Sequence, residues 1–241
     1  MTSIPTPAAR RRPPRGGILM TFVILLLVVM GVAGTVMWNR TREEKVIINR
    51  RAQTEPKMML DRYFVLLGVR HRASDPDWQE LLDFMSRDDR LWLDENRATL
   101  ARLDPDLNGR NPLHLKPEAQ TWSAVHALLD FGSHKVRPVV STLRVNGVHA
   151  VAYIHDPGRI DTIRPIFLVQ ESGYWKLRRF GGARDSEPVM RLLVESKSTS
   201  GLPLTAEDQA WQRNPAAYEQ QMQDALLREA GVDPNAQVQA N

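Results

Sequence analysis

The sequence contains no cysteine in its 241 residues. This absence excludes disulfides, zinc sites built from thiolates, cysteine nucleophiles, thioether-bound haem and lipid attached to a lipobox cysteine. It leaves the compartment open, because a cysteine-free domain is stable in oxidising and in reducing surroundings. No Ser-His-Asp triad, phosphate-binding glycine loop or paired-histidine motif can be assembled from the sequence without invoking unseen geometry. No motif therefore predicts a particular reaction, and we expect no cofactor.

A strong excess of one charge is also missing. Apolar residues make up 42% of the chain and charged residues 25%, which is ordinary for a globular protein and excludes global disorder or a protein with many membrane spans. The formal charge of +4 is modest and comes partly from arginines near the N-terminus. An anionic lipid surface explains it as well as nucleic acid does. We expect one soluble domain and no nucleic-acid partner.

One long apolar run stands near the N-terminus. No charged residue occurs from Gly16 to Asn39. At 1.5 Å per residue, about 22 residues reach roughly 33 Å, enough to cross the hydrocarbon core of a bilayer. The run therefore predicts a transmembrane helix over residues 17–38 with the lipid bilayer as its partner. The side chains chosen as markers of this anchor are Ile18, Phe22, Leu26, Met30 and the interfacial Trp38.

A cleaved signal peptide is the competing interpretation, because Gly31, Val32 and Ala33 resemble a small-residue cleavage site. The apolar run continues to Met37, which favours retention. Basic residues flank both ends of the run, so they do not decide orientation by number. The short, acid-free leading tail favours a cytoplasmic N-terminus and a periplasmic or extracytoplasmic domain, with the protein in the inner membrane. Residues 1–16 are predicted to be a disordered basic tail at the lipid headgroups.

Residues 39–53 are predicted to continue the helix or to link it to a domain over residues 54–182. The domain begins with helical periodicity: a helix capped by Thr54, a second starting at Asp75 and Pro76, a surface helix over 87–103 and a short helix ending at Gly132. The period then changes to two, over residues 136–145, 148–155, 163–170 and 174–180. Asn-Gly between the first two of these runs is a strong hairpin signal.

These patterns predict an α+β fold, with helices packed on an antiparallel sheet of three to four or more strands. Residues 183–241 are predicted to be a linker, including 196–203, followed by one helix. Asn214 is its expected cap, Pro215 its first residue and Gly231 its terminating residue.

Helices followed by a hairpin-linked sheet that ends in Gln170-Glu171-Ser172-Gly173-Tyr174-Trp175-Lys176-Leu177 resemble the nuclear transport factor two-like superfamily, which includes SnoaL-like proteins. The resemblance covers about residues 54–182 and implies helices packed across a curved sheet. That family contains dehydratases, isomerases, ligand-binding modules and assembly subunits, so the resemblance leaves function open. A single span before such a domain is also similar to periplasmic assembly subunits of bacterial secretion machines.

One segment matches the opening of a calcium loop. Asp104, Asp106 and Asn108 occupy positions one, three and five, and Gly109 follows. Position twelve is Leu115 instead of glutamate. The alternative is a purely structural role, in which Asp-Pro ends a helix and a turn follows. We predict no metal, with these three residues as the candidates if one binds. His126 lies beside an apolar helix stripe and is expected to be structural.

A possible catalytic face lies on the second predicted strand. His149, Tyr153 and His155 share one side of it, and these residue types suit general acid and base chemistry. The opposite side is wholly apolar and is the natural core face, which leaves the two histidines on the wetter side. We therefore expect no catalytic residue, with these three as the candidates.

Basic residues recur on the third and fourth predicted strands and just after them. One interpretation is the solvated face of an antiparallel sheet, and the other is a docking surface for an acidic protein or for lipid headgroups. The residues of this predicted basic patch are Arg159, Arg164, Lys176, Arg178, Arg179 and Arg184.

Two functions follow from these patterns. The first is a non-enzymatic, membrane-anchored accessory or scaffold subunit with a membrane protein partner. The alternative is a small-molecule-binding protein or a lyase or isomerase with a pocket between sheet and helices.

Overall fold

The computed structural model describes residues 16–69, 78–107, 111–131 and 137–237. The chain forms two compact units, one ending at Ile48 and one that starts at Asn49 and runs to the C-terminus. Residues 1–15 of the predicted tail, and the predicted helix start at Asp75 and Pro76, lie outside the described residues.

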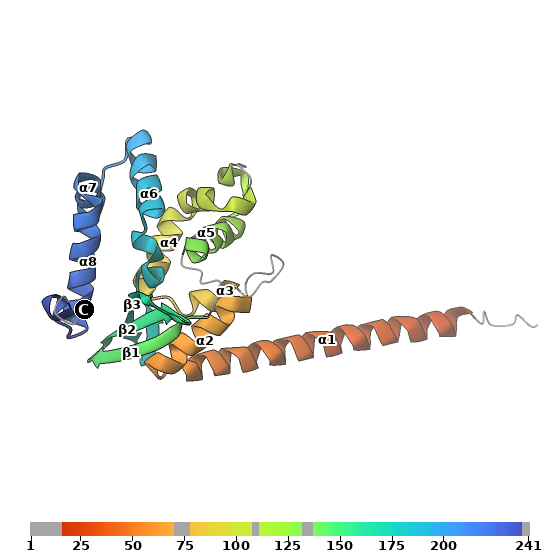
Figure 1. Cartoon of the computed structure of the whole chain (residues 1–241). Helices are drawn as coiled ribbons and strands as arrows, with labels where there is room; N and C mark the ends of the chain where they lie inside the picture. The colour runs from red at the N-terminus through yellow and green to blue at the C-terminus, as the bar shows by residue number, and fades with distance from the viewer. Residues whose placement is uncertain (1–15, 70–77, 108–110, 132–136, 238–241) are drawn as a thin grey trace, which may run out of the picture. The chain divides into compact units, whose positions relative to one another are not determined.

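The first unit contains most of helix α1, Gly16–Ala52 (Figure 1). Its long apolar segment contains the polar side chain of Thr35, which hydrogen-bonds within the helix. The Thr35 hydroxyl donates to the carbonyls of Gly31 and Val32, at 3.1 and 2.8 Å. Residues 39–52 continue the same helix, which resolves the open choice between a helix and a linker in this region.

The second unit is built on one antiparallel sheet with the strand order β1-β2-β3-β4 (Figure 1). Its strands are β1 (Val139–Asn146), β2 (His149–Asp156), β3 (Arg159–Glu171) and β4 (Tyr174–Leu177). The predicted Asn-Gly hairpin is confirmed, with Gly147 at a φ of 58° that glycine adopts readily. The helices and this sheet confirm the α+β fold class.

The last strand is shorter than predicted. Arg179 and Phe180 have φ angles of 55° and 50°, in the left-handed region, so extended backbone cannot continue through residue 180. The chain instead forms the irregular turn η4, Arg179–Asp185.

Helices precede and follow the sheet along the chain. The preceding elements are α2 (Pro56–Val69), α3 (Trp78–Leu82), α4 (Arg87–Leu100), η1 (Ala101–Leu103), η2 (Pro105–Leu107), η3 (Pro112–His114) and α5 (Pro117–Phe131). The following elements are α6 (Glu187–Thr199), α7 (Ala206–Arg213), α8 (Pro215–Glu229) and η5 (Pro234–Gln237).

One face of the sheet carries the main hydrophobic core. Ala150, Ala152 and Ile154 on β2 are at most 1% exposed and belong to one cluster with apolar side chains of α2, α4 and α5. The prediction that this side of β2 is the core face is therefore confirmed.

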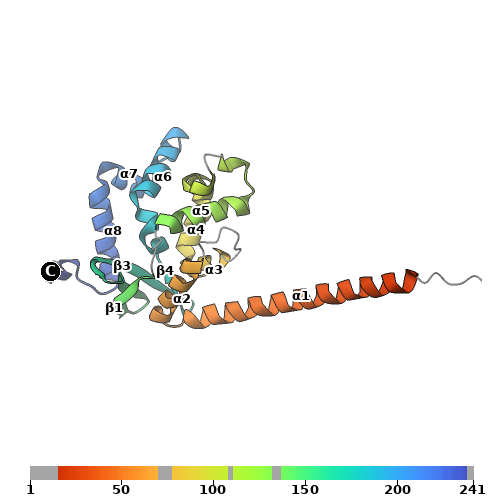
Figure 2. The ribbon, with the colours of Figure 1, turned by 45° about the vertical axis from the view of Figure 1, so that its right-hand side comes forward.

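The opposite face of the sheet is covered as well. Val151 is fully buried against Leu227, Ala230 and Val232 at the end of α8 and just after it. Figure 1 and the turned view of Figure 2 both show α8 beside the sheet. The description of this side as the wetter side was therefore wrong at Val151, because a helix distant in sequence packs on it.

Helix α4 differs from the predicted surface helix in having a buried side. Leu93 and Leu100 join the main core, while Leu91 is exposed. Ser86 caps the helix, and its hydroxyl accepts a hydrogen bond from the Asp89 backbone N–H at 3.2 Å. Asp89 itself is buried, which its position in a charge-rich segment did not indicate.

The C-terminal region contains three α-helices instead of a linker and one helix. The prediction of a linker at 196–203 was wrong as far as Thr199, because α6 buries Val189, Met190 and Leu193 and runs through that segment. The last predicted helix is confirmed as α8. The Asn214 side chain caps it by accepting a hydrogen bond from the Ala217 N–H at 3.1 Å.

The two edges of the sheet differ. The β4 edge is covered, because the Leu177 N–H donates to the Phe84 carbonyl at 2.7 Å and the Trp175 N–H donates to the Gln53 carbonyl at 2.7 Å. Among the described residues, no backbone segment is hydrogen-bonded to the outer edge of β1. Val139 and Val145 on β1 are exposed.

Candidate functional site

The apolar part of α1 is the first candidate functional element. The helix from Phe22 to Ala52 is long enough to cross a membrane and contains an 18-residue window with a mean hydropathy of 2.2. Each large apolar side chain from Phe22 to Trp38 is at least half exposed, Leu26 and Met30 among them. The side chain of Ile18 lies outside the described part of the chain. The protein thus has one long apolar N-terminal helix that is a candidate membrane anchor.

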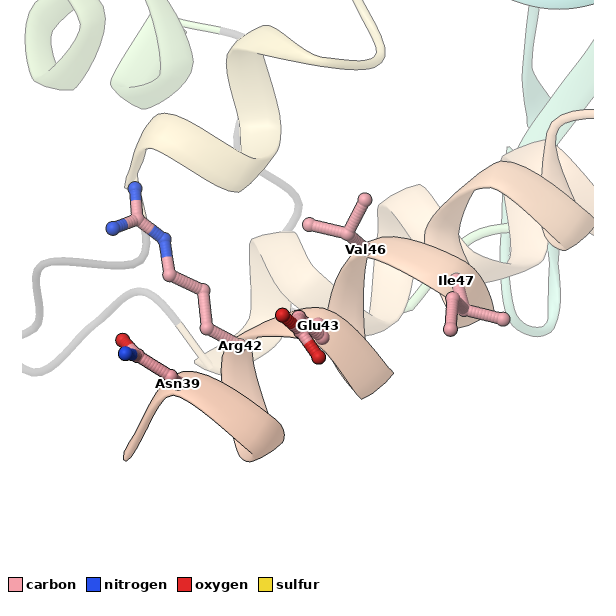
Figure 3. Close-up of a pocket in the computed structure, with 5 residues that line it drawn as sticks. All are labelled: Asn39, Arg42, Glu43, Val46 and Ile47. Carbon is pink, nitrogen blue, oxygen red and sulfur yellow. The ribbon is translucent and has the colours of Figure 1, made fainter. Parts of the chain in front are cut away.

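The polar continuation of α1 carries a shallow hollow along one side. Figure 3 shows the side chains that line it, which recur at helical spacing after the apolar segment: Asn39, Arg42, Glu43, Val46 and Ile47. This spacing places polar and apolar groups together on one side of the helix. Such a mixed surface next to an apolar span suits the headgroup layer of a bilayer.

The candidate catalytic residues on β2 have separate surroundings. His149 Nδ1 is 3.7 Å from a carboxylate oxygen of Glu229, and the His155 ring nitrogen Nδ1 is 2.9 Å from the backbone carbonyl of Asp156. Tyr153 packs on the hydrophobic cluster formed with the end of α8. His155 and Tyr153 thus each have a structural partner, whereas His149 Nδ1 is buried and has no hydrogen-bond partner among the described residues. These contacts do not show a shared acid and base pair.

A hollow of about 260 Å³ lies between β3 and α8. Its apolar wall comes from Pro165 and Phe167 on β3 and from Met222 and Leu226 on α8. Arg179 reaches the same hollow from η4. The hollow is thus a mainly apolar space with a polar rim, the usual character of a small-ligand site.

Arg179 is also the centre of a half-buried ion-pair network. Its guanidinium binds Asp185 through two nitrogens and also donates to Glu207 and to the Tyr218 hydroxyl. The Tyr218 hydroxyl in turn donates to Glu207. The network therefore joins the turn after β4 to α7 and α8, three elements that local sequence does not connect.

The charges of this network shift its protonation equilibria. Burial opposes the charge on Glu207, but the hydrogen bonds from Tyr218 and Arg179 outweigh it and lower the pKa of the carboxyl. Burial and the bond to Glu207 raise the pKa of Tyr218. Burial raises the pKa of Asp89, although the Phe180 backbone N–H and the nearby charge of Arg184 lower it in part.

The predicted basic patch does not form one open surface. Arg178 pairs with Glu229, Arg179 pairs as described above, and Lys176 donates to Gln53 and to the Asp83 carbonyl. Arg184 is 3.6 Å from Asp89 and lies over the Trp92 ring at 4.7 Å. Arg159 pairs with Asp161 at 2.9 Å on the surface, and Arg164 also has an interaction partner. Most of these residues thus interact with other groups of the second unit.

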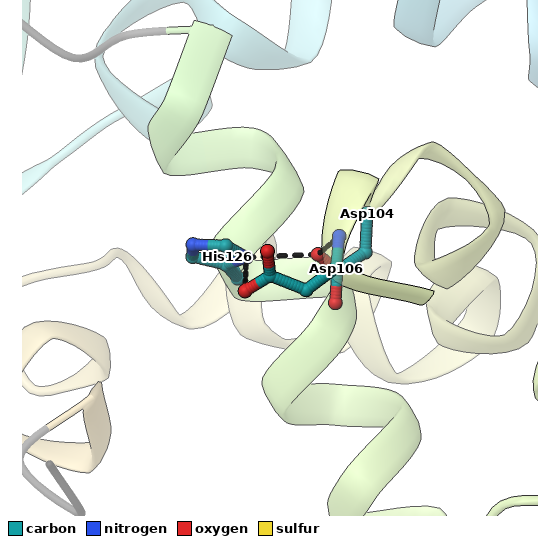
Figure 4. Close-up of side chains that lie close together, drawn as sticks. All are labelled: Asp104, Asp106 and His126. Atoms are coloured by element: carbon teal, nitrogen blue, oxygen red, sulfur yellow. Dashed lines mark hydrogen bonds and ion pairs between the residues drawn. The ribbon is translucent and has the colours of Figure 1, made fainter. Parts of the chain in front are cut away.

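The acidic loop after η1 meets a histidine from α5 (Figure 4). Asp104 Oδ1 is 2.9 Å from His126 Nδ1, and an oxygen of Asp106 is 3.8 Å from the same nitrogen. Asn108, the third predicted ligand, lies outside the described residues. These three side chains, Asp104, Asp106 and His126, form the one group in the described part of the chain with the geometry to hold a metal ion.

The sequence analysis did not predict the residues that join the Arg179 network and the Asp104 and Asp106 pair from distant parts of the chain. His126 is twenty residues away from Asp106, and Glu207 and Tyr218 follow Arg179 by 28 and 39 residues. No local spacing links these positions. A conserved pairing in homologous chains would be the signal that could find them.

Comparisons of the chain with models of protein families, with curated proteins and with solved structures found no match.

Proposed function

We propose that the protein is a single-pass, membrane-anchored accessory or scaffold subunit of a membrane protein complex and has no catalytic activity of its own. The observation that carries this proposal is the exposed apolar segment of α1, a single helix that runs on to Ala52 at the start of the folded α+β unit. Exposed apolar side chains on that scale require a lipid environment.

The open edge of the sheet is the surface that we propose for the partner protein. An unpaired edge strand presents N–H and C=O groups that can bind an extended segment of another chain. β1 adds exposed apolar side chains at Val139 and Val145, and Val148 beside the strand is also exposed. Arg178 and Arg179, which lie near α8, are already paired internally, and we therefore place the docking surface on β1.

The proposed location is a bacterial inner membrane, with the second unit on the periplasmic or extracytoplasmic side. The support is the basic, acid-free composition of residues 1–15, which precede the apolar run. Protease added to spheroplasts, from which the outer membrane has been removed, should digest the domain. Digestion of the domain only in inverted vesicles would show that it lies on the cytoplasmic side instead.

The resemblance to the nuclear transport factor two-like superfamily belongs to the same proposal. It is supported by the meander order of the sheet and by the helices packed on the face of β2 that carries Ala150 and Ile154. That superfamily includes assembly subunits as well as enzymes, so the resemblance fits an accessory role.

The test uses the full chain, extracted from its native membrane in a mild detergent and separated under native conditions. We expect a particle larger than the protein monomer in its micelle. Because the chain has no cysteine, a photo-crosslinker can be attached at one introduced thiol. Thr142→Cys on exposed β1 should crosslink to one partner, and Leu113→Cys, which is 69% exposed and away from the sheet, is the matched control. A monomer at every expression level, with no adduct at position 142, would refute the proposal.

The hollow between β3 and α8 favours a second candidate, a small-molecule-binding protein or a lyase or isomerase. Its apolar wall of Phe167, Met222 and Leu226 would take an apolar ligand. The thermal unfolding temperature of the full chain should then rise in the presence of such a ligand. Met222→Trp should fill the hollow and abolish this rise. The variants His149→Gln and His155→Gln test the catalytic form of this hypothesis, because a lyase or isomerase that uses these residues would lose turnover without unfolding.

A further inference from the structure

The Asp104, Asp106 and His126 cluster lies where a short acidic turn meets helix α5. Asp104 stands between η1 and η2, and its Oδ1 accepts a hydrogen bond from the Asp106 backbone N–H at 3.0 Å. This bond tightens the turn and brings both carboxylates to the same side, toward His126 (Figure 4). The turn is thus held in place before any ligand arrives.

The distances within the cluster suit a small metal ion. His126 Nδ1 is 2.9 Å from Asp104 and 3.8 Å from Asp106. Tetrahedral zinc with bonds of about 2.0–2.1 Å places its ligand atoms about 3.3 Å apart, which lies between these two distances. Small side-chain rotations would therefore bring all three groups to one ion.

A second observation points to a missing ligand. The Asp104 side chain is completely buried, yet its second oxygen, Oδ2, has no hydrogen-bond partner among the described residues. Buried carboxylate oxygens are almost always hydrogen-bonded or bound to a metal, because water no longer solvates them. The His126 interaction uses the other oxygen, so an internal salt bridge alone leaves Oδ2 unexplained.

The ring of His126 is oriented by a neighbour on the same helix. The Trp122 ring stacks on it, with the ring centres 5.1 Å apart and the planes inclined by 16°. This stack restrains the plane in which the two ring nitrogens lie. The Asp106 side chain is 55% exposed, which leaves a route for an ion to enter from solvent.

We propose that Asp104, Asp106 and His126 bind one zinc ion, with water in the fourth position. A nitrogen ligand with two carboxylates is a donor set for zinc and its transition-metal neighbours. Calcium takes six to eight oxygen ligands, and His126 supplies a nitrogen where a calcium loop would supply an oxygen. The geometry thus replaces the calcium interpretation of Asp104 and Asp106 with a zinc site. This inference is independent of the proposed accessory function.

The test is a titration of the detergent-solubilised full chain with zinc chloride, after treatment with a chelator, by isothermal calorimetry. We expect one zinc per chain and a higher unfolding temperature with zinc. Asp106→Asn and His126→Gln should weaken binding by at least about 10- to 100-fold, the range that even surrounding residues of metal sites contribute. Asp106→Asn keeps the test valid if variants at buried Asp104 fail to fold, because Asp106 is exposed.

His149→Gln is the matched control, since it removes a histidine that lies 3.7 Å from the carboxylate of Glu229 outside the cluster. It should bind zinc as the unaltered chain does. No zinc binding by the unaltered chain, or equal binding by Asp106→Asn and His126→Gln, would overturn the proposal. Calcium that displaces zinc at equal concentration would overturn it as well, because it would identify an oxygen-only site.

Discussion

Replacing Arg179 should destabilise the packing of the C-terminal helices. In Arg179→Met the carboxylates of Asp185 and Glu207 lose their shared cation while staying close to the Tyr218 hydroxyl. The Arg179 and Asp185 side chains are only 13% and 17% exposed, so water replaces the guanidinium poorly. Removing one partner of a buried pair costs about 3–5 kcal/mol. Glu207 is 33% exposed, which favours the lower end, about 3 kcal/mol.

Thermal unfolding of the full chain in detergent, followed by circular dichroism, measures the global effect. A loss of about 3 kcal/mol lowers the midpoint by roughly 6–12 °C in a domain of this size. Hydrogen exchange locates it, because the amides of α7 and α8 should exchange faster while those of β2 and α5 change less. Trp211 on α7 is buried and reports loosening of that helix through its fluorescence.

Arg159→Met is the matched control, because Arg159 pairs with Asp161 where both side chains are more than 60% exposed. It should leave the midpoint unchanged, as expected for a surface pair. Adding Glu207→Gln to Arg179→Met should recover part of the lost stability, because it removes a half-buried carboxylate charge that no longer has a cation partner. Equal effects of Arg179→Met and Arg159→Met, or no recovery in the double variant, would refute the role assigned to the network.

The remaining predictions concern pH, the core and the span. The pKa of Glu207 is lower in the folded chain than in the unfolded chain. Its contribution to the free energy of unfolding is therefore complete above its ordinary pKa of 4.5 and is lost as the pH falls through the folded pKa. Unfolding midpoints between pH 7 and pH 3 should therefore fall less steeply in Glu207→Gln, and equal slopes would count against this. Ile154→Val in the main core should cost about 0.5–1.5 kcal/mol in chemical unfolding, whereas Ile160→Val, at a site 72% exposed, should have no measurable effect. Leu26→Arg near the middle of the apolar segment should cost about 2.5–3.5 kcal/mol of insertion and increase the fraction extracted from membranes by carbonate, and an unchanged fraction would argue against a span.

Local chemistry determined the elements that depend on few neighbours. The apolar run of α1 is a candidate membrane anchor, because its length and composition match the hydrocarbon core of a bilayer. The Asn146-Gly147 turn and the Asn214 cap are likewise properties of two or three adjacent residues, and the structure confirms both. The alternation of β2 correctly placed Ala150 and Ile154 in the core.

Elements in polar surroundings were harder to predict. Helix α6 follows the glycines at 181 and 182, and only a narrow apolar stripe from Val189 to Val194 marks it. Its burial depends on residues distant in sequence, because Met190 and Val194 pack with Trp211 of α7 and Tyr218 of α8. The end of β4 depends on left-handed φ angles at Arg179 and Phe180, which non-glycine residues adopt only when tertiary contacts enforce them.

The sequence by itself determined the apolar helix, the fold class and the core face of the sheet, because each is encoded in residues that are neighbours along the chain. Only the tertiary structure decided that α8 covers the second face at Val151, that Arg179 is bound by Glu207, and that His126 meets Asp104. The reason is physical: a charge or an apolar side chain specifies that it needs a partner, but not which distant residue folding will bring to it.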